Sequence, residues 1–193
     1  MDEAEAVIDR VIAAQSENTF VLGAMSDLHY GSKYSESQFY NNKAVEHACQ
    51  AMKYIDERIK LDAVAILGDY TDRFSSNDSE NALGDFKKIN SFLDKLRAST
   101  NLRQQGNHDF YSEHTPITHR FIQAYSDDVV WGSKIGGYYY KDFEDYKLRI
   151  ISINTTETAN LNDSYTTENI IACSTNQYNW FAKSLDLTDK NDA

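Results

Sequence analysis

Three segments of the first hundred residues carry apolar side chains at helical spacing, and each is followed by a short apolar run. The expected helices are residues 2–16, 35–59 and 81–98. The runs, which are typical of buried strands, are residues 19–25, 63–67 and 102–105. Strands that alternate with helices form parallel sheets with helices on their faces, so we expect an α/β fold.

The second half of the chain has a less regular pattern. We expect a short helix near residues 118–125, strands at residues 137–143 and 147–154, and a helix from Ser174 onward. Ser174 and Gln177 have the spacing of a capping box, in which the side chain of the first residue accepts a bond from the amide of the second. Ser35 and Gln38 repeat that spacing at the start of the second helix.

The 193 residues fit one domain, and no repeat or low-complexity linker divides them. We assign residues 1–18 to a helical extension and residues 19–193 to the domain. No apolar run approaches the roughly 18 residues that cross a bilayer, and the acidic start lacks the basic residues of a signal peptide. We therefore expect no membrane association and a cytoplasmic location.

The formal net charge of the chain is -11. A surface this negative repels phosphate backbones, so we expect no non-specific binding of nucleic acid. Carboxylates that gather to hold divalent cations account for part of such acidity, and a solvated acidic surface accounts for the rest.

Polar side chains follow each of the three early strands. In parallel sheets ligands bind beyond the carboxyl ends of the strands, which makes these turns the candidate site. The first turn contains Asp27-Leu28-His29, the second Gly68-Asp69-Tyr70-Thr71-Asp72-Arg73, and the third Gly106-Asn107-His108-Asp109. The glycines allow the backbone to turn sharply and to approach a ligand closely.

The side chains in these turns are suited to divalent metal. Asp27 and His29 are separated by one residue and can reach a single ion if the backbone turns between them. The carboxylate of Asp69 can bridge two ions, and Asn107 offers a carbonyl oxygen to a second ion. This mixture of oxygen and nitrogen suits manganese, iron or zinc better than calcium, which prefers oxygen alone.

Each motif taken alone has a simpler interpretation. A single Asp-x-His pair occurs often by chance, and glycine with aspartate or asparagine is common in ordinary turns. The combination is more specific, because three such motifs each follow a predicted strand directly. We therefore interpret the three turns as one metal site.

The three motifs in this order resemble those of the calcineurin-like metallophosphoesterases. Residues 174–185, with the pattern Ser-x-x-Gln-x-x-Trp-Phe, also resemble a helix that many members of this family carry. The resemblance implies an αββα sandwich with mixed sheets and flanking helices, here truncated and lacking its C-terminal histidine motifs. It also implies metal-dependent hydrolysis of phosphomonoesters or phosphodiesters by a water that two metal ions activate.

The resemblance implies a role for each matching residue. Asp27 and His29 would hold the first metal, Asp69 would bridge both metals, and Asn107 would hold the second. His108 would contact the phosphate and protonate the leaving oxygen, with Asp72 or Asp109 as an orienting partner. Arg73 would contact the phosphate, although pairing with a surface carboxylate explains it equally well.

The family also supplies histidines to both metals from later motifs, and this chain has no histidine after His119. We therefore expect a fragment with weak or no activity, whose first metal site could be occupied and whose second is weak or empty. An uncovered sheet edge would favour pairing with another copy of the chain. The alternative is a non-catalytic scaffold or recognition module of a larger assembly, such as a phage particle.

Overall fold

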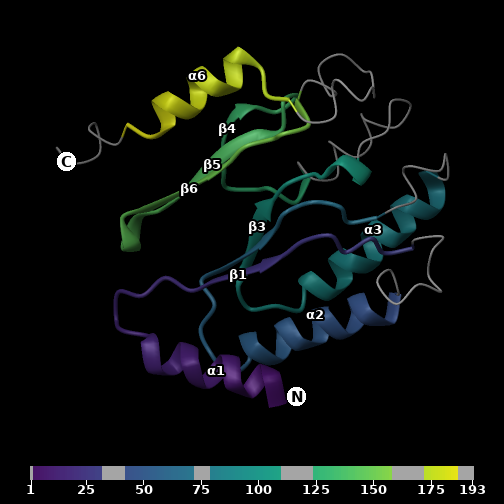
Figure 1. The fold of residues 1–193 in the computed structure, drawn as a ribbon, viewed down its shortest axis with the longest axis vertical. Coiled ribbons are helices and arrows are strands. Elements are labelled where there is room, and N and C mark those ends of the chain that lie inside the picture. Colours follow the sequence, from purple (N-terminus) through teal and green to yellow (C-terminus); the bar gives the residue numbers. More distant parts are fainter. Residues whose placement is uncertain (1, 32–41, 72–78, 110–123, 158–171, 187–193) are drawn as a thin grey trace.

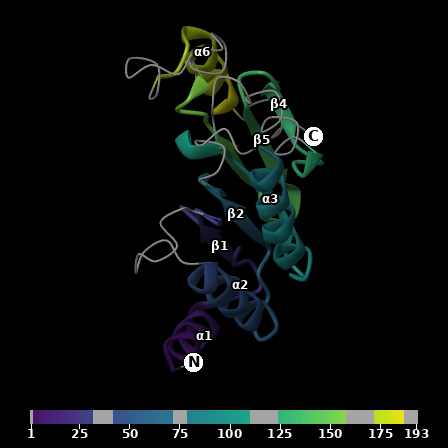
Figure 2. The same ribbon diagram turned by 90° about the vertical axis from the view of Figure 1, so that its right-hand side faces the viewer.

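The helices and strands of the protein stack in four layers. The computed structural model describes residues 2–31, 42–71, 79–109, 124–157 and 172–186. Within this part of the chain, three helices cover a parallel sheet, an antiparallel sheet lies behind it, and a further helix closes the stack (Figure 1). A view turned by 90° again places α1 and α6 at opposite ends (Figure 2). This order confirms the expected αββα sandwich.

The parallel sheet confirms the strands predicted from the apolar runs. Its order is β1-β2-β3, with both pairs parallel. The strands are β1 (Leu22–Met25), β2 (Ala63–Ile66) and β3 (Ser99–Arg103). The helices on its outer face are α1 (Asp2–Ala14), α2 (Asn42–Asp56) and α3 (Ser79–Leu93).

Strand β2 is the centre of the fold, because all four of its residues are buried. Val64 and Ile66 face the helices and join the core there, whereas Ala63 and Ala65 pack between the two sheets. Full burial of a Val- or Ile-sized side chain contributes about 1.5–3 kcal/mol, so Val64 and Ile66 anchor the strand firmly to the helices. Its carboxyl end is therefore a rigid platform for the turn that follows.

The antiparallel sheet carries a regular ladder between its second and third strands. Its order is β4-β5-β6, and β5 and β6 pair through five consecutive positions. The elements are β4 (Val130–Ser133), β5 (Tyr138–Phe143), a short 3-10 turn η3 (Glu144–Tyr146) and β6 (Leu148–Ser152). Tyr139 faces inward to the core between the sheets, while Tyr138 packs on Trp180 of helix α6 (Thr175–Ser184).

The cap of α6 follows the sequence prediction in one direction only. Ser174 Oγ accepts a bond of 3.1 Å from the amide of Gln177, as expected. The Gln177 side chain does not return this bond but donates to Asn154 O and to Glu157. The carboxylate of Glu157 accepts from the Ser174 amide instead, which ties the helix to the end of β6.

Several element boundaries differ from the sequence prediction, and the largest difference is at the end of the third helix. The third helix ends at Leu93 rather than residue 98, because the amide of Arg97 donates to the buried Asp56 carboxylate at 2.5 Å and draws the chain out of the helix. Strand β3 therefore begins at Ser99, three residues before the expected position. Strand β4 was not predicted. Its four residues include Gly132, and half of them are exposed, so it leaves almost no periodic signal.

Some predictions fall outside the described residues. These are the capping box of Ser35 and Gln38 and most of the helix expected at residues 118–125. The division at residue 18 stays a prediction, although Ile8 of α1 is buried in the same core as β2. Among the described helices, none is long and apolar enough to cross a membrane.

Candidate metal centre

The turns after β1 and β2 stay paired beyond the ends of their strands. The amide of Asp27 donates to Gly68 O at 3.2 Å, and the amide of His29 donates to Asp69 O at 2.8 Å. One step further, the amide of Tyr30 donates to Tyr70 O at 2.9 Å. Main-chain bonds alone therefore fix these two turns against each other.

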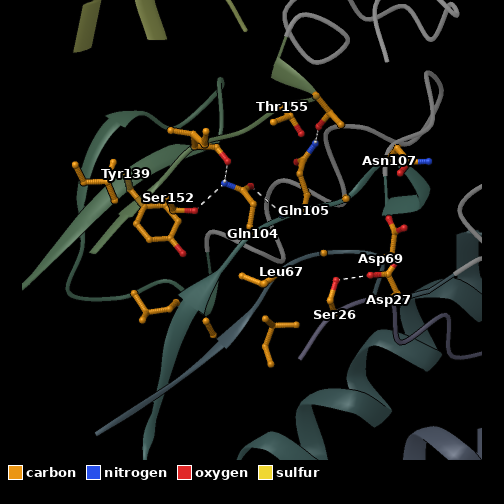
Figure 3. Close-up of a pocket in the computed structure, with 18 of the residues that line it drawn as sticks. Ser26, Asp27, Leu67, Asp69, Gln104, Gln105, Asn107, Tyr139, Ser152 and Thr155 are labelled. Carbon is orange, nitrogen blue, oxygen red and sulfur yellow. Dashed lines mark hydrogen bonds between the residues drawn. The ribbon is translucent and has the colours of Figure 1, made fainter. Parts of the chain in front are cut away.

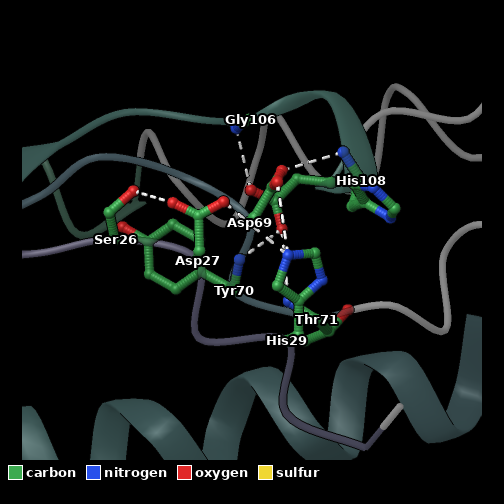
Figure 4. Close-up of polar contacts among 9 residues, drawn as sticks. Ser26, Asp27, His29, Asp69, Tyr70, Thr71, Gly106 and His108 are labelled. Atoms are coloured by element: carbon green, nitrogen blue, oxygen red, sulfur yellow. Dashed lines mark hydrogen bonds and ion pairs between the residues drawn. The ribbon is translucent and has the colours of Figure 1, made fainter. Parts of the chain in front are cut away.

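Three of the four predicted metal ligands converge at this edge of the sheet. His29 Nε2 lies 3.5 Å from Asp69 Oδ2 and 3.8 Å from Asp27 Oδ1 (Figure 4). His108 is close by, since its ring meets that of His29 edge-on at 4.7 Å between centroids. The ligand atoms of His29, Asp69 and His108 lie within 4.8 Å of one another. The convergence that strand order predicted is present in the structure.

Asn107 begins the short 3-10 turn η2 (Asn107–Asp109) that follows β3. It lines the same cavity as Asp27 and Asp69 and is partly exposed (Figure 3). Asp72 and Arg73 lie outside the described residues, so their predicted roles stay predictions.

The backbone is strained at the converging residues. Asp27, His29 and Asp69 have φ values of 55°, 45° and 52°, a region that non-glycine residues rarely adopt. Each such residue costs on the order of 1–3 kcal/mol and persists only where its surroundings impose the conformation. Strain of this kind clusters at functional sites, and here it falls on three predicted ligands.

Two glycines allow the second and third turns to touch. A Cβ atom on Gly68 would lie 2.7 Å from Gly106 Cα, and Gly68 has a φ of 109°. A Cβ atom on Gly106 would lie 2.6 Å from the amide nitrogen of Asp69. The sequence predicts that these glycines allow close approach to a ligand. The structure shows that they allow the second and third turns to approach each other.

Asp109 joins the same two turns from inside the protein. Its side chain is fully buried, and Oδ1 accepts from the amides of Tyr70 at 2.8 Å and Thr71 at 3.4 Å. Oδ2 accepts from the amide of Gly106 at 2.9 Å. Burial raises the pKa of the Asp109 carboxyl to about 8, while the Gly106 amide lowers it and the neighbouring Asp69 raises it.

The donor set and its spacing fit a divalent cation. Two atoms that bind one ion at about 2.1 Å lie about 3.0–3.4 Å apart, close to the separations of His29 Nε2 from the two carboxylates. Asp69 and Asp109 also place two buried carboxyl groups side by side, and a cation would offset their repulsion. Imidazole with carboxylates suits manganese, iron and zinc.

The cavity beside this edge extends between the two sheets. Its volume is about 470 Å³, and Asp27, Asp69 and Asn107 stand at one end of it. Leu67 and Tyr139 form part of its apolar wall, and Figure 3 shows both against the cavity. Gln104 spans the gap: its Nε2 donates to Ser152 Oγ at 2.9 Å and to Gly137 O at 3.0 Å.

The contacts that support this site carry little signal in the sequence. The bonds of Asp109 run to backbone amides, and the Ser26 hydroxyl donates to the Asp27 carboxylate. Gln104 links the third turn to the second sheet. The GNHD motif flagged Asp109 as a candidate, but nothing in the pattern indicated that its partners are main-chain groups.

Comparison with known proteins gives one match. No curated protein and no solved structure matches the chain. The model of the calcineurin-like phosphoesterase family matches residues 20–193, which includes all three turns and the α6 helix. The chain therefore belongs to the calcineurin-like phosphoesterase family.

Proposed function

We propose that this sheet edge binds divalent metal ions and hydrolyses phosphomonoesters or phosphodiesters. Family membership indicates a phosphoesterase-type function, with divalent metals and phosphoester substrates. The proposal of a metal centre at this edge rests on the position of His29 Nε2, which lies 3.5 Å from the Asp69 carboxylate and 3.8 Å from that of Asp27. All three residues have a positive φ. Manganese, iron or zinc fits this donor set.

Asp27 and His29 would hold the first ion together with one oxygen of Asp69. Asp69 is suited to bridging because its two oxygens face different turns: Oδ2 faces His29, and Oδ1 accepts from the amide of His108 at 2.9 Å. Asn107, which begins the third turn, would supply its carbonyl oxygen to the second ion. When bound, such a pair of ions activates water and offsets charge on the phosphoryl oxygens.

His108 is the residue that would move a proton. Its ring lies against that of His29, and its amide is anchored on Asp69, so the imidazole is held at the rim of the ligand cluster. From there it would protonate the departing alcohol oxygen. Asp72 and Asp109 are the two candidates for its orienting partner. The bonds that the structure gives Asp109 run to main-chain amides of the second and third turns.

The two ions would not bind equally. The first ion would have three ligands among the described residues, Asp27, His29 and Asp69, whereas the second would share Asp69 and take Asn107. We therefore expect the first site to bind more tightly than the second.

Calorimetric titration with Mn²⁺ tests the proposal. The unmodified chain should bind one ion tightly, and Asp69→Asn should abolish that binding. Asp128→Asn is the matched control, because Asp128 also has a positive φ but lies on an exposed turn away from the site. Hydrolysis of bis-p-nitrophenyl phosphate, if detected, should require Mn²⁺ and disappear in Asp69→Asn. Binding that survives Asp69→Asn, or no binding at all, would favour the non-catalytic module.

A further inference from the structure

The three turns of the site are joined in two different ways. The first and second are joined by three main-chain bonds, from the amides of Asp27, His29 and Tyr30. The second and third are joined by side-chain carboxylates, because Asp109 and Asp69 accept the amides that connect them. Replacing a side chain can break the second junction and leave the first intact.

Asp109 has the geometry of a clamp across that second junction. Its two oxygens divide between the turns, with Oδ1 on Tyr70 and Thr71 and Oδ2 on Gly106. Two of the residues that it holds are direct neighbours of predicted ligands: Tyr70 follows Asp69, and Gly106 precedes Asn107. It is fully buried, so water does not compete for these bonds.

The clamp also holds the second and third turns in close contact. Gly68 and Gly106 are in contact, and the Asp69 side chain lies against Gly106, so the two turns are pressed to a separation that only glycine permits. A carboxylate that draws amides from both turns inward holds them at this separation.

We propose that Asp109 is a positioning residue that sets the distance between Asp69 and Asn107, and so selectively governs the second of the two metal sites. The inference rests on the proposed metal centre, in which these two residues share the second ion. The first site depends on Asp27, His29 and Asp69, whose turns stay joined without Asp109.

Asp109→Asn provides a sharp test because it is nearly isosteric. The amide of asparagine has one acceptor and one donor, so whichever way it turns, a donor faces the amides of one turn. Asp56→Asn is the matched control. Asp56 is also a buried aspartate that accepts a backbone amide, that of Arg97, but it lies far from the site.

Two measurements are made on the full chain. Electron paramagnetic resonance counts free Mn²⁺ during a titration and yields the dissociation constant of each binding event. Amide hydrogen exchange, followed by NMR without metal, reports the bonds of Gly106 in the second junction and of His29 in the first. A merely structural role would weaken both metal sites and lower the exchange protection of both amides together. The deciding quantity is therefore the ratio of the two dissociation constants.

In Asp109→Asn we expect the second dissociation constant to rise by about 10-fold or more while the first is unchanged, and Gly106 to exchange faster while His29 does not. In Asp56→Asn the ratio of the two constants should stay the same. An equal change at both sites, or none, would overturn the inference. If the unmodified chain binds fewer than two ions, amide hydrogen exchange is the deciding measurement. Unchanged protection of the Gly106 amide in Asp109→Asn would then overturn the proposed role of Asp109. Absence of any binding counts against the metal centre alone.

Discussion

The two sheets of this protein differ in where backbone strain falls. In the parallel half the strands β1 and β2 have only four residues each, and the turns after them contain non-glycine residues with positive φ. In the antiparallel half β5 and β6 form a regular five-position ladder, and positive φ occurs at Asp128, Gly137 and Lys147, in the turns beside the strands. Strain in the second half serves chain reversal, whereas strain in the first half shapes a site.

This difference distinguishes side chains that would bind metal from side chains that hold the fold together. Among the side chains of the parallel half that would bind metal, Asp27 is 68% exposed and contributes little to the core, whereas His29 and Asp69 are buried at the end of the sheet. Polar side chains of the antiparallel half, such as Asn154 and Gln177, are buried and fully engaged in hydrogen bonds. Substitutions in the two halves should therefore affect different measurements.

The largest effect is expected where the two turns meet. In Gly106→Ala the new Cβ would lie 2.6 Å from the backbone nitrogen of Asp69, which cannot move without shifting the turn. We expect a loss of about 3 kcal/mol in the free energy of unfolding, together with loss of Mn²⁺ binding. Urea denaturation and calorimetry measure both. Gly84→Ala in α3, where a Cβ meets nothing within 4 Å, should instead stabilise by about 1 kcal/mol. A Gly106→Ala variant that keeps its stability and metal would contradict the close contact.

The antiparallel half should show the reverse pattern. Asn154 donates to Gly136 O at 2.7 Å and accepts from the Thr156 amide at 2.9 Å, both buried. Asn154→Ala leaves these groups without partners, so we expect a loss of about 2 kcal/mol in unfolding free energy with the first Mn²⁺ site retained. Asn101→Ala removes an exposed bond to Asp127 O and should change stability by only about 0.5 kcal/mol. Loss of Mn²⁺ binding by folded Asn154→Ala would contradict the prediction that substitutions in the antiparallel half affect stability and not metal binding.

Substitution of Asp27 separates backbone strain from ligand chemistry. With a φ of 55°, this position favours glycine over alanine, whereas alanine is the more stabilising of the two within helices and strands. We expect Asp27→Gly to be about 1 kcal/mol more stable than Asp27→Ala in thermal or urea unfolding, although both lose the first Mn²⁺ site. Equal stability of the two variants would mean that the strain at this turn is relieved in solution.

The smallest effect concerns the free edge of the antiparallel sheet. Strand β6 is the last strand in the order β4-β5-β6 among the described residues, and Ile153 just beyond it is 44% exposed. We predict weak self-association through this edge, seen by light scattering as a rise in mass with concentration, and its reduction by Ile153→Lys. A strict monomer at high concentration would refute it.

Much of the parallel half could be predicted because its signals are local. Apolar runs of seven and five residues mark β1 and β2, and the polar residues that follow them converge because strands of a parallel sheet end at one edge. The ligand candidates Asp27, His29 and Asp69 follow from that rule. The short strand β4 could not be found in this way, since its ladder with β5 depends on distant pairing rather than on its own four residues.

The support of the site was beyond the reach of sequence. The partners of Asp109 are backbone amides, which every residue but proline carries, so no pattern of side chains identifies them. The contact between Gly68 and Gly106 joins residues 38 positions apart. The early end of α3 likewise depends on Asp56, a residue of another helix.

Anomalous diffraction from crystals grown with Mn²⁺ shows whether this sheet edge binds metal, because it locates the ion without reference to activity. We predict an anomalous peak about 2.1 Å from His29 Nε2 and between the carboxylates of Asp27 and Asp69, present in the unmodified chain and absent in Asp69→Asn. No peak at this edge at saturating Mn²⁺, or a peak that remains in Asp69→Asn, would contradict it.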